Sequence, residues 1–272
     1  MKNKLTHDEI KQRQIEVLKY FKSVCDECGL RYSLAYGTLL GAVRHGGYIP
    51  WDDDIDVCMP CEDYERFIAE MKKRNDRFKL AHVDTHKTYI QSFSKLFDSE
   101  TLVVKRDKKF KQTQNIGLAI DVFPLYYCPE DTQEFYKCLN EVVRIRKIRS
   151  YALAKGVQKR GNILKTLLVT IYKFFVTIPG YKYWIKREEK VIKKLNGSKS
   201  QLLCAWNVVI SERERVNAEQ FRDMGEIRFE DETYSCFADP HRFLSDRYGD
   251  YMQPPPENER VSPHDFDAYR IK

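Results

Sequence analysis

Apolar and polar residues along the first forty positions change from a helical to a strand-like spacing. Residues 6–9 read Thr-His-Asp-Glu, the spacing of a capping box, and apolar residues then recur at helical intervals from Ile15 to Cys25. This pattern predicts a helix over 7–28 that ends at Gly29. Alternating and aromatic residues over 30–36 predict a strand, and a Gly-containing turn then leads into a short helix over 38–43.

The following segments predict a sheet flanked by helices. Residues 44–51 form a loop rich in Gly and Pro, residues 53–59 alternate as in a strand, and residues 62–73 have amphipathic helical spacing. Further apolar runs typical of strands lie at 78–83, 89–97, 101–105 and 116–123. Together these elements predict an α+β fold whose sheet is mixed or antiparallel.

The chain changes character near residue 130. An apolar run over 163–178 carries Lys165 and Lys173 as its charges, Pro179 and Gly180 interrupt it, and a basic helical pattern resumes over 181–195. We therefore predict a basic helical insertion at 129–204. It would divide a core at 1–128 from a C-terminal segment at 205–272 that completes the same domain.

The composition excludes a disordered chain and gives no sign of a membrane-spanning helix. Of the 272 residues, 42% are hydrophobic and 13% aromatic, which is enough to bury a sizeable core. No uncharged apolar run reaches the length needed to span a bilayer, and the polar N-terminus lacks the apolar stretch of a signal peptide. We therefore expect a cytoplasmic protein whose eight Cys are reduced thiols.

Positive charge is concentrated in one segment. Residues 140–200 contain 16 Lys and Arg against three Asp and Glu, whereas the whole chain has a net charge of only +7. A polybasic segment gains about 1 kcal/mol per Lys or Arg near an anionic leaflet. We expect peripheral, salt-sensitive contact with the inner face of a membrane, with an anionic glycan as the alternative partner. The apolar stripe within 164–175 either inserts shallowly or packs on the core.

The informative chemistry lies in a group of carboxylates. If residues 54–57 form a strand, Asp54 and Asp56 project from one face about 6–7 Å apart, where their charges repel unless a cation lies between them. Asp121 lies in another apolar strand, where burial is costly unless the carboxylate is paired or binds metal. Carboxylate oxygens suit Mg²⁺ or Mn²⁺. A solvated acidic turn at 52–56 and a hydrogen-bonded core Asp121 are the structural alternatives.

Three strand-borne Asp that follow a Gly-Thr turn form the pattern of the nucleotidyltransferase superfamily, which predicts a nucleotidyltransferase-like mixed sheet. The longer motifs are more specific, and with them the chain resembles the LicD family, whose vertebrate relatives include fukutin and fukutin-related protein. The motifs that carry this resemblance lie at 36–57, 63–67, 94–98, 120–124, 243–244 and 248–252.

The resemblance implies transfer of phosphocholine, or of ribitol or glycerol phosphate, from a CDP-linked donor to a hydroxyl of a cell-surface glycan such as teichoic acid or lipopolysaccharide, or of its lipid-linked precursor. CMP is released. Asp54 and Asp56 would bind Mg²⁺ or Mn²⁺, and Asp121 would complete the metal site and orient or deprotonate the attacking hydroxyl.

Residues around the carboxylates are candidates for contact with the CDP-alcohol donor. Gly37 and Thr38 would cradle the donor pyrophosphate, and Arg44 suits a bidentate phosphate contact unless it is a surface residue. His45 either donates to phosphate or packs in the loop. Lys95 either neutralises the leaving CMP or is a solvated strand residue. Trp51 either stacks on the base or folds the loop.

Two pairs of cysteines have the spacing of zinc ligands. Cys25 and Cys28 form one Cys-x-x-Cys pair and Cys58 and Cys61 another, but buried apolar cysteines fit the same positions. Rival functions remain for the whole chain. One is a nucleotidyltransferase that acts on RNA or a small molecule, although no RNA-binding motif accompanies the basic segment and no nucleic acid is expected. Another is a non-enzymatic basic adaptor that binds membrane or polymer.

Overall fold

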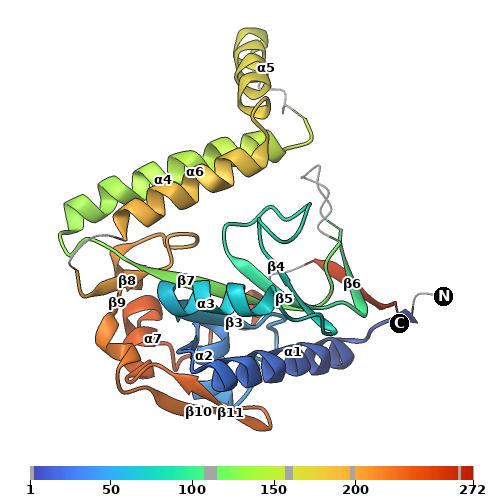
Figure 1. The fold of residues 1–272 in the computed structure, drawn as a ribbon, viewed down its shortest axis with the longest axis vertical. Helices are drawn as coiled ribbons and strands as arrows, with labels where there is room; N and C mark the ends of the chain where they lie inside the picture. The colour runs from blue at the N-terminus through green and yellow to red at the C-terminus, as the bar shows by residue number, and fades with distance from the viewer. Residues whose placement is uncertain (1–2, 107–114, 157–161, 197–199, 263–264, 272) are drawn as a thin grey trace.

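The computed structural model describes residues 3–106, 115–156, 162–196, 200–262 and 265–271 (Figure 1). Its main sheet follows the order β2-β3-β7-β5-β4, and β8 extends it from β7 to β9. The pairing of β3 with β7 is parallel and every other pairing in this sheet is antiparallel. The strands of this sheet are β2 (Ser33–Leu34), β3 (Asp56–Pro60), β4 (Phe78–Ala81), β5 (Ser94–Asp98), β7 (Ala119–Tyr127), β8 (Leu202–Cys204) and β9 (Val216–Asn217).

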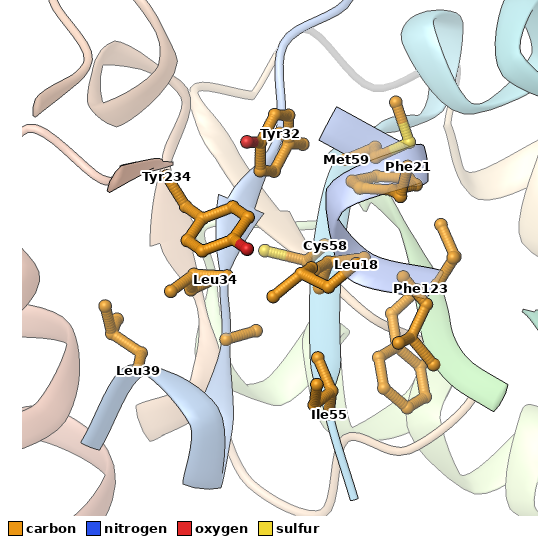
Figure 2. Close-up of a cluster of buried hydrophobic side chains, with 14 of the residues drawn as sticks. Leu18, Phe21, Tyr32, Leu34, Leu39, Ile55, Cys58, Met59, Phe123 and Tyr234 are labelled. Atoms are coloured by element: carbon orange, nitrogen blue, oxygen red, sulfur yellow. The ribbon is translucent and has the colours of Figure 1, made fainter. Parts of the chain in front are cut away.

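Helix α1 (His7–Cys28) has the ends that its sequence predicts. The Thr6 side chain accepts from the Glu9 amide, the Glu9 carboxylate accepts from the Thr6 amide, and Gly29 ends the helix at φ 60°. Its buried face packs beside α3 (Cys61–Met71), where the Phe21 and Phe67 rings meet at 5.1 Å between centroids. Figure 2 shows Leu18 and Phe21 of α1 packed near β3 residues. The main core therefore lies directly behind β3.

A layer of helices follows β7. Helices α4 (Thr132–Leu153) and α6 (Tyr181–Leu195) run side by side, and α5 (Ile163–Thr177) projects away from them (Figure 1). A second apolar cluster joins α4 and α6 to the sheet through Phe135, Ile192 and Trp206. No single helix in the described part of the chain is long and apolar enough to cross a membrane.

The remaining elements close the two ends of the fold. Helix α7 packs near the N-terminal end of α2 and the hairpin of β10 and β11 near its C-terminal end, and a small sheet of order β1-β12-β6 joins the two chain ends. Their bounds are α2 (Tyr36–His45), α7 (Pro240–Tyr248), β1 (Asn3–Lys4), β6 (Thr101–Lys105), β10 (Gly225–Phe229), β11 (Glu232–Cys236) and β12 (Phe266–Arg270), with short 3₁₀ turns at Glu212–Glu214, Ala218–Phe221 and Glu257–Glu259.

The predicted mixed α+β class is confirmed, and several predicted bounds are wrong. The strand expected at 30–36 is reduced to β2 because Tyr36, at φ 50°, already begins α2. The strand expected at 53–59 begins only at Asp56, so Asp54 precedes it. Only the end of the run at 89–97 forms a strand, and the segment expected to be a helical insertion ends in strand β8. The proposed division at residues 128 and 204 stays a prediction.

Candidate functional site

Two of the predicted carboxylates lie side by side in the sheet. In the parallel pairing of β3 with β7, Asp56 and Asp121 are register partners, and the Asp121 amide donates to the Ile55 carbonyl at 2.8 Å. On its other side Asp121 pairs in register with Lys95 of β5, whose ammonium donates to the Asp121 carboxylate. Asp56, Asp121 and Lys95 therefore form one row across three neighbouring strands.

A second group of carboxylates lies in the loop directly before β3. One carboxylate oxygen from each of Asp52, Asp53 and Asp54 lies within 4.8 Å of the others, an arrangement that can hold a metal ion. Asp53 is buried, and its carboxylate accepts from the Ser262 hydroxyl. The prediction that one strand carries both Asp54 and Asp56 on the same face is wrong, because β3 begins at Asp56 and Asp54 precedes it. The two side chains are close enough to interact nonetheless.

The carboxylates close to Asp56 change its pKa. Burial raises its pKa well above the usual range for a carboxyl group, and the negative charges of Asp54 and Asp121 raise it further, against the opposing charge of Lys95. A hard divalent cation would relieve the repulsion, since its preferred ligands are oxygens. Asp54, Asp56 and Asp121 offer oxygen donors of the kind that Mg²⁺ or Mn²⁺ prefers, while the carboxylates whose oxygens converge in the described part of the chain are those of Asp52, Asp53 and Asp54.

The first turn of α2 lies against these carboxylates. The Thr38 hydroxyl accepts from the Asp56 amide at 2.8 Å, so this side chain fixes the start of β3. A Cβ added to Gly37 would lie 2.6 Å from an Asp52 carboxylate oxygen, so any larger residue there would displace that carboxylate. The amides of this turn carry the partial positive charge of a helix N-terminus. Gly37 and Thr38 are therefore beside the candidate metal site.

Arg44 and His45 lie in the last turn of α2 and not in a loop, as the sequence led us to expect. Arg44 lies seven residues after Gly37, about 10 Å along the helix axis. Its guanidinium donates to the Tyr251 carbonyl at 2.7 Å and to His45 at 3.0 Å. The structure thus brings Arg44 and His45 together but separates their backbone from the first turn that holds Gly37.

Trp51 contacts this cationic group and directly precedes the carboxylates in the chain. The His45 and Trp51 rings meet edge to face at 6.4 Å, and the Arg260 guanidinium lies 5.5 Å from the Trp51 ring centroid. Burial and the nearby Arg44 charge lower the pKa of His45, which favours a neutral imidazole at pH 7. Trp51 directly precedes Asp52, so an aromatic ring with the Arg260 guanidinium over it adjoins the acidic group in the chain.

The sequence analysis assigned no role to a set of residues beside Asp56. The Arg247 guanidinium lies 4.4 Å from the Tyr36 ring centroid and forms an ion pair with Glu214. Burial raises the pKa of Tyr248, the Arg247 charge and hydrogen bond oppose this shift, and the negative charge of Asp56 adds to it. Only the docking of α7 brings these residues together, although 248–252 is one of the motifs that carried the family resemblance. That motif was the one signal available.

The two cysteine pairs do not form a zinc site in the described part of the chain. All eight cysteines are free thiols, and the group of carboxylates at 52–54 is the one set of three or more potential ligands that converges among the described residues. Cys25 and Cys58 are buried in the core, and burial raises the pKa of both thiols. The reading of these residues as small buried apolar side chains therefore holds.

The comparisons with known proteins agree with the motifs around this site. Residues 29–141 match a family model described as LicD/FKTN/FKRP, nucleotidyltransferase domain. The lipopolysaccharide cholinephosphotransferase LicD of Haemophilus influenzae is 27% identical over 98% of both chains. The ribitol 5-phosphate transferase FKRP of human and of mouse is 48% identical over 48 residues, which is 18% of this chain and 10% of that protein. The predicted resemblance to the LicD family is confirmed, and all the predicted site residues lie within the matched segment.

Proposed function

We propose that this chain, a relative of the LicD family over residues 29–141, is a metal-dependent alcohol-phosphate transferase with a nucleotidyltransferase-like core. It would move phosphocholine from CDP-choline to a hydroxyl of a cell-surface glycan or its lipid-linked precursor, and release CMP. The observation that carries the proposal is the row of Asp56, Asp121 and Lys95 across three strands, with Asp54 beside it. A lipopolysaccharide cholinephosphotransferase that aligns over nearly the whole chain supports the choice of phosphocholine as the transferred group and of a glycan as the acceptor.

The residues divide into those that hold a cation and those that handle phosphate and proton. Asp54, Asp56 and Asp121 would hold Mg²⁺ or Mn²⁺, which when bound supplies charge neutralisation for the donor phosphates. The acceptor hydroxyl oxygen bonds to the phosphorus that bears the alcohol, and the bond from that phosphorus to the oxygen of CMP breaks. CMP leaves with the bonding electrons, and Asp121 accepts the hydroxyl proton.

The cationic side chains stabilise the charge on the leaving CMP. Lys95 already neutralises Asp121, and its ammonium lies one strand from the candidate metal site. Arg44 and the amides of the first turn of α2 supply further positive charge toward phosphate oxygens. Trp51 offers a ring face for the cytosine. This division makes Lys95 the partner both of Asp121 and of the leaving phosphate.

A donor screen tests the proposal. Purified protein is given CDP-choline, CDP-ethanolamine, CDP-ribitol or CDP-glycerol with Mg²⁺ and a glycan acceptor extract, and CMP is measured. We expect CMP release with CDP-choline, its loss in EDTA, and its recovery on addition of Mg²⁺ or Mn²⁺. CMP release with CDP-ribitol instead would favour the ribitol alternative, which the short match to the ribitol 5-phosphate transferase supports.

The product separates the rival functions. Pyrophosphate formed from a nucleoside triphosphate would identify a nucleotidyltransferase, because the nucleoside phosphate and not the alcohol phosphate would then be transferred. Full turnover in excess chelator would contradict the metal site. No turnover of any CDP-alcohol, with binding to anionic polymer, would favour the adaptor.

A further inference from the structure

Helix α5 has its apolar side turned away from the protein. It extends beyond the layer of α4 and α6 (Figure 1), and Val176 is its one buried residue in the described structure. A surface helix of a folded domain ordinarily turns its apolar stripe toward the core. In α5 the apolar stripe faces away from the core instead. Covering this stripe therefore requires a partner outside the described fold.

The exposed apolar residues share one side of the helix. At 100° per residue they occupy an arc of about 180°, with Lys165, Lys173 and the threonines on the other arc. Their exposed fractions run from 43% to 90%. The residues of this outward face, with Ile178 just after the helix, are Ile163, Leu164, Leu167, Leu168, Ile171, Tyr172, Phe174, Phe175 and Ile178.

The polar side of α5 is fastened to the protein. The Lys173 ammonium donates to the carbonyls of Ala154 and Gly156, at 2.6 and 2.7 Å, at the end of α4. The Trp184 indole at the start of α6 donates to the Val176 carbonyl at 2.7 Å. These contacts hold the helix with its lysine inward, so a simple roll of α5 onto the core would break them. The contacts that attach α5 to α4 and α6 therefore also keep its apolar face turned outward.

We propose that this outward face of α5 inserts into one leaflet of an anionic lipid membrane. The charges around the helix favour this occupant, because exposed Lys165 lies in the first turn of α5 and exposed Lys155 follows α4 beside the carbonyls that hold Lys173. Exposed Arg187 lies 5.9 Å from the Trp184 ring centroid, whose indole contacts Val176 of α5, and these cations would meet acidic headgroups. A face of large aliphatic and aromatic side chains bordered by cations is typical of interfacial helices.

The helix is too short to cross the bilayer. Its 15 residues span about 22 Å, against a hydrocarbon core of about 30 Å. By length and composition α5 and α6 together would suffice, but they meet at 76° and α6 buries Ile185 and Ile192 against the protein. Helix α6 therefore stays with the protein and α5 alone enters the leaflet. The proposal goes beyond the transferase function and does not depend on it.

Vesicle binding tests the proposal without an activity assay. Full-length protein is sedimented with vesicles of pure phosphatidylcholine and with vesicles of equal parts phosphatidylcholine and phosphatidylglycerol. We expect tighter binding to the mixed vesicles, and binding that high salt weakens but does not abolish, because apolar insertion remains when charge is screened.

Two sets of variants separate insertion from charge attraction. The triple variant Leu167→Ser, Ile171→Ser, Phe174→Ser should lower the partition coefficient at least about tenfold at high salt. The matched control Ile210→Ser, Val261→Ser replaces other exposed apolar residues and should leave binding unchanged. Charge reversal at Arg187, Lys190 and Lys194 should remove mainly the salt-sensitive part. This set omits Lys186 and Lys193, which pair with Asp84 and Glu65.

Three results would overturn the proposal. The first is no sedimentation of the wild-type protein with either vesicle. The second is binding at high salt that the triple serine variant retains in full. The third is a stable dimer in solution, measured by light scattering, that the triple variant converts to monomer, which would assign the outward face to a second copy of the chain. Circular dichroism and thermal unfolding of each variant show that the fold is kept.

Discussion

At Asp56, a negative charge that would help to bind a cation is also expected to destabilise the fold when no cation is bound. Its carboxylate is partly buried beside Asp54 and Asp121, and this crowding raises its pKa well above the usual range. Asp56→Asn keeps the shape of the side chain and removes one of the repelling charges. We expect the variant to unfold at an equal or higher temperature than the wild type in EDTA, because no cation then offsets the repulsion. A purely structural Asp56 predicts the opposite, a lower unfolding temperature.

The same substitution should remove the proposed activity. Asp54→Asn, Asp56→Asn and Asp121→Asn should each lower CMP release about a thousandfold or more, since loss of a principal metal ligand costs several kcal/mol of transition-state stabilisation. Asp223→Asn, at an exposed position of the C-terminal segment, is the control and should keep wild-type rates. Activity within tenfold of wild type in any of the three would remove that residue from the catalytic group.

Glu189 makes a testable contribution to the pH dependence of stability. Burial raises its pKa from 4.5 to about 7, helped by the charge of Asp84 and opposed by Lys193 and Lys186. His82, 3.9 Å away, has its own pKa lowered to about 4 by burial and is neutral in this range. The unfolded chain therefore loses the Glu189 proton first as the pH rises. The free energy of unfolding should fall between about pH 4.5 and 7 and change no further above that range.

Urea denaturation of Glu189→Gln across this range measures the effect. The amide cannot ionise, so the variant should be more stable than the wild type above pH 7, by at most about 3 kcal/mol, and the difference should shrink toward pH 4.5. Glu141→Gln, at an exposed position of α4, is the control. Parallel stability profiles of Glu189→Gln and the wild type would show that Glu189 ionises alike in both states.

At the scale of the elements, helix α2 and the loop before β3 are held together by close backbone contact. A Cβ at Gly41 would lie 2.4 Å from the Gly47 carbonyl oxygen and 3.1 Å from the Ile49 amide nitrogen. Gly41→Ala should therefore displace the loop that carries the carboxylates at 52–54, at a cost of about 1–3 kcal/mol in the free energy of unfolding. Activity should fall further than the lost fraction of folded protein explains.

Gly156→Ala is the matched control for that variant, because a Cβ there meets no atom within 4 Å. It should leave both stability and activity near those of the wild type. Circular dichroism reports the fold and CMP release reports the site. Full activity in Gly41→Ala would show that the loop adjusts without moving its carboxylates, and that the contact at Gly41 does not set the site.

The sequence predicted correctly those elements whose ends depend on neighbouring residues in the chain. The capping box at Thr6 and the left-handed Gly29 fixed α1, and the apolar alternation identified β3 and β7, which carry Asp56 and Asp121. The pairing of Asp121 with Lys95 depends on strand order, which no local spacing encodes.

Distant partners explain the predictions that were wrong or missing. Arg44 was expected in a loop but lies in the last turn of α2. Its guanidinium donates there to the carbonyl of Tyr251, which lies more than two hundred residues further along the chain. Arg247 and Glu214 meet beside Tyr36 only after α7 docks. The apolar stripe of α5 could be predicted from its spacing, but the side to which it turns could not, because contacts with the ends of α4 and α6 decide it.

At the scale of the whole molecule, buried Glu188 connects the helical layer to the segment that precedes β5. Glu188 of α6 is fully buried, 2.9 Å from the Arg149 guanidinium of α4, and its other carboxylate oxygen accepts from the Ser92 hydroxyl at 3.1 Å. Ser92 lies two residues before β5, the strand that carries Lys95. The helical layer and the candidate site therefore share this contact, and we expect them to unfold in one cooperative transition.

A double-mutant cycle tests that expectation. Glu188→Ala leaves the Arg149 charge buried without its partner and should cost about 3–5 kcal/mol in the free energy of unfolding. Arg149→Met alone should cost less, because the Arg146 guanidinium still lies 3.6 Å from the Glu188 carboxylate. The double variant Arg149→Met, Glu188→Met replaces both charges by apolar side chains of similar volume, so it should recover most of the loss. Urea unfolding followed by Trp fluorescence and by circular dichroism should give coincident curves for the wild type. Costs that simply add in the double variant would show that Arg149 and Glu188 do not act as a pair, and two separate transitions would show that the contacts of Glu188 do not couple the helical layer to the sheet.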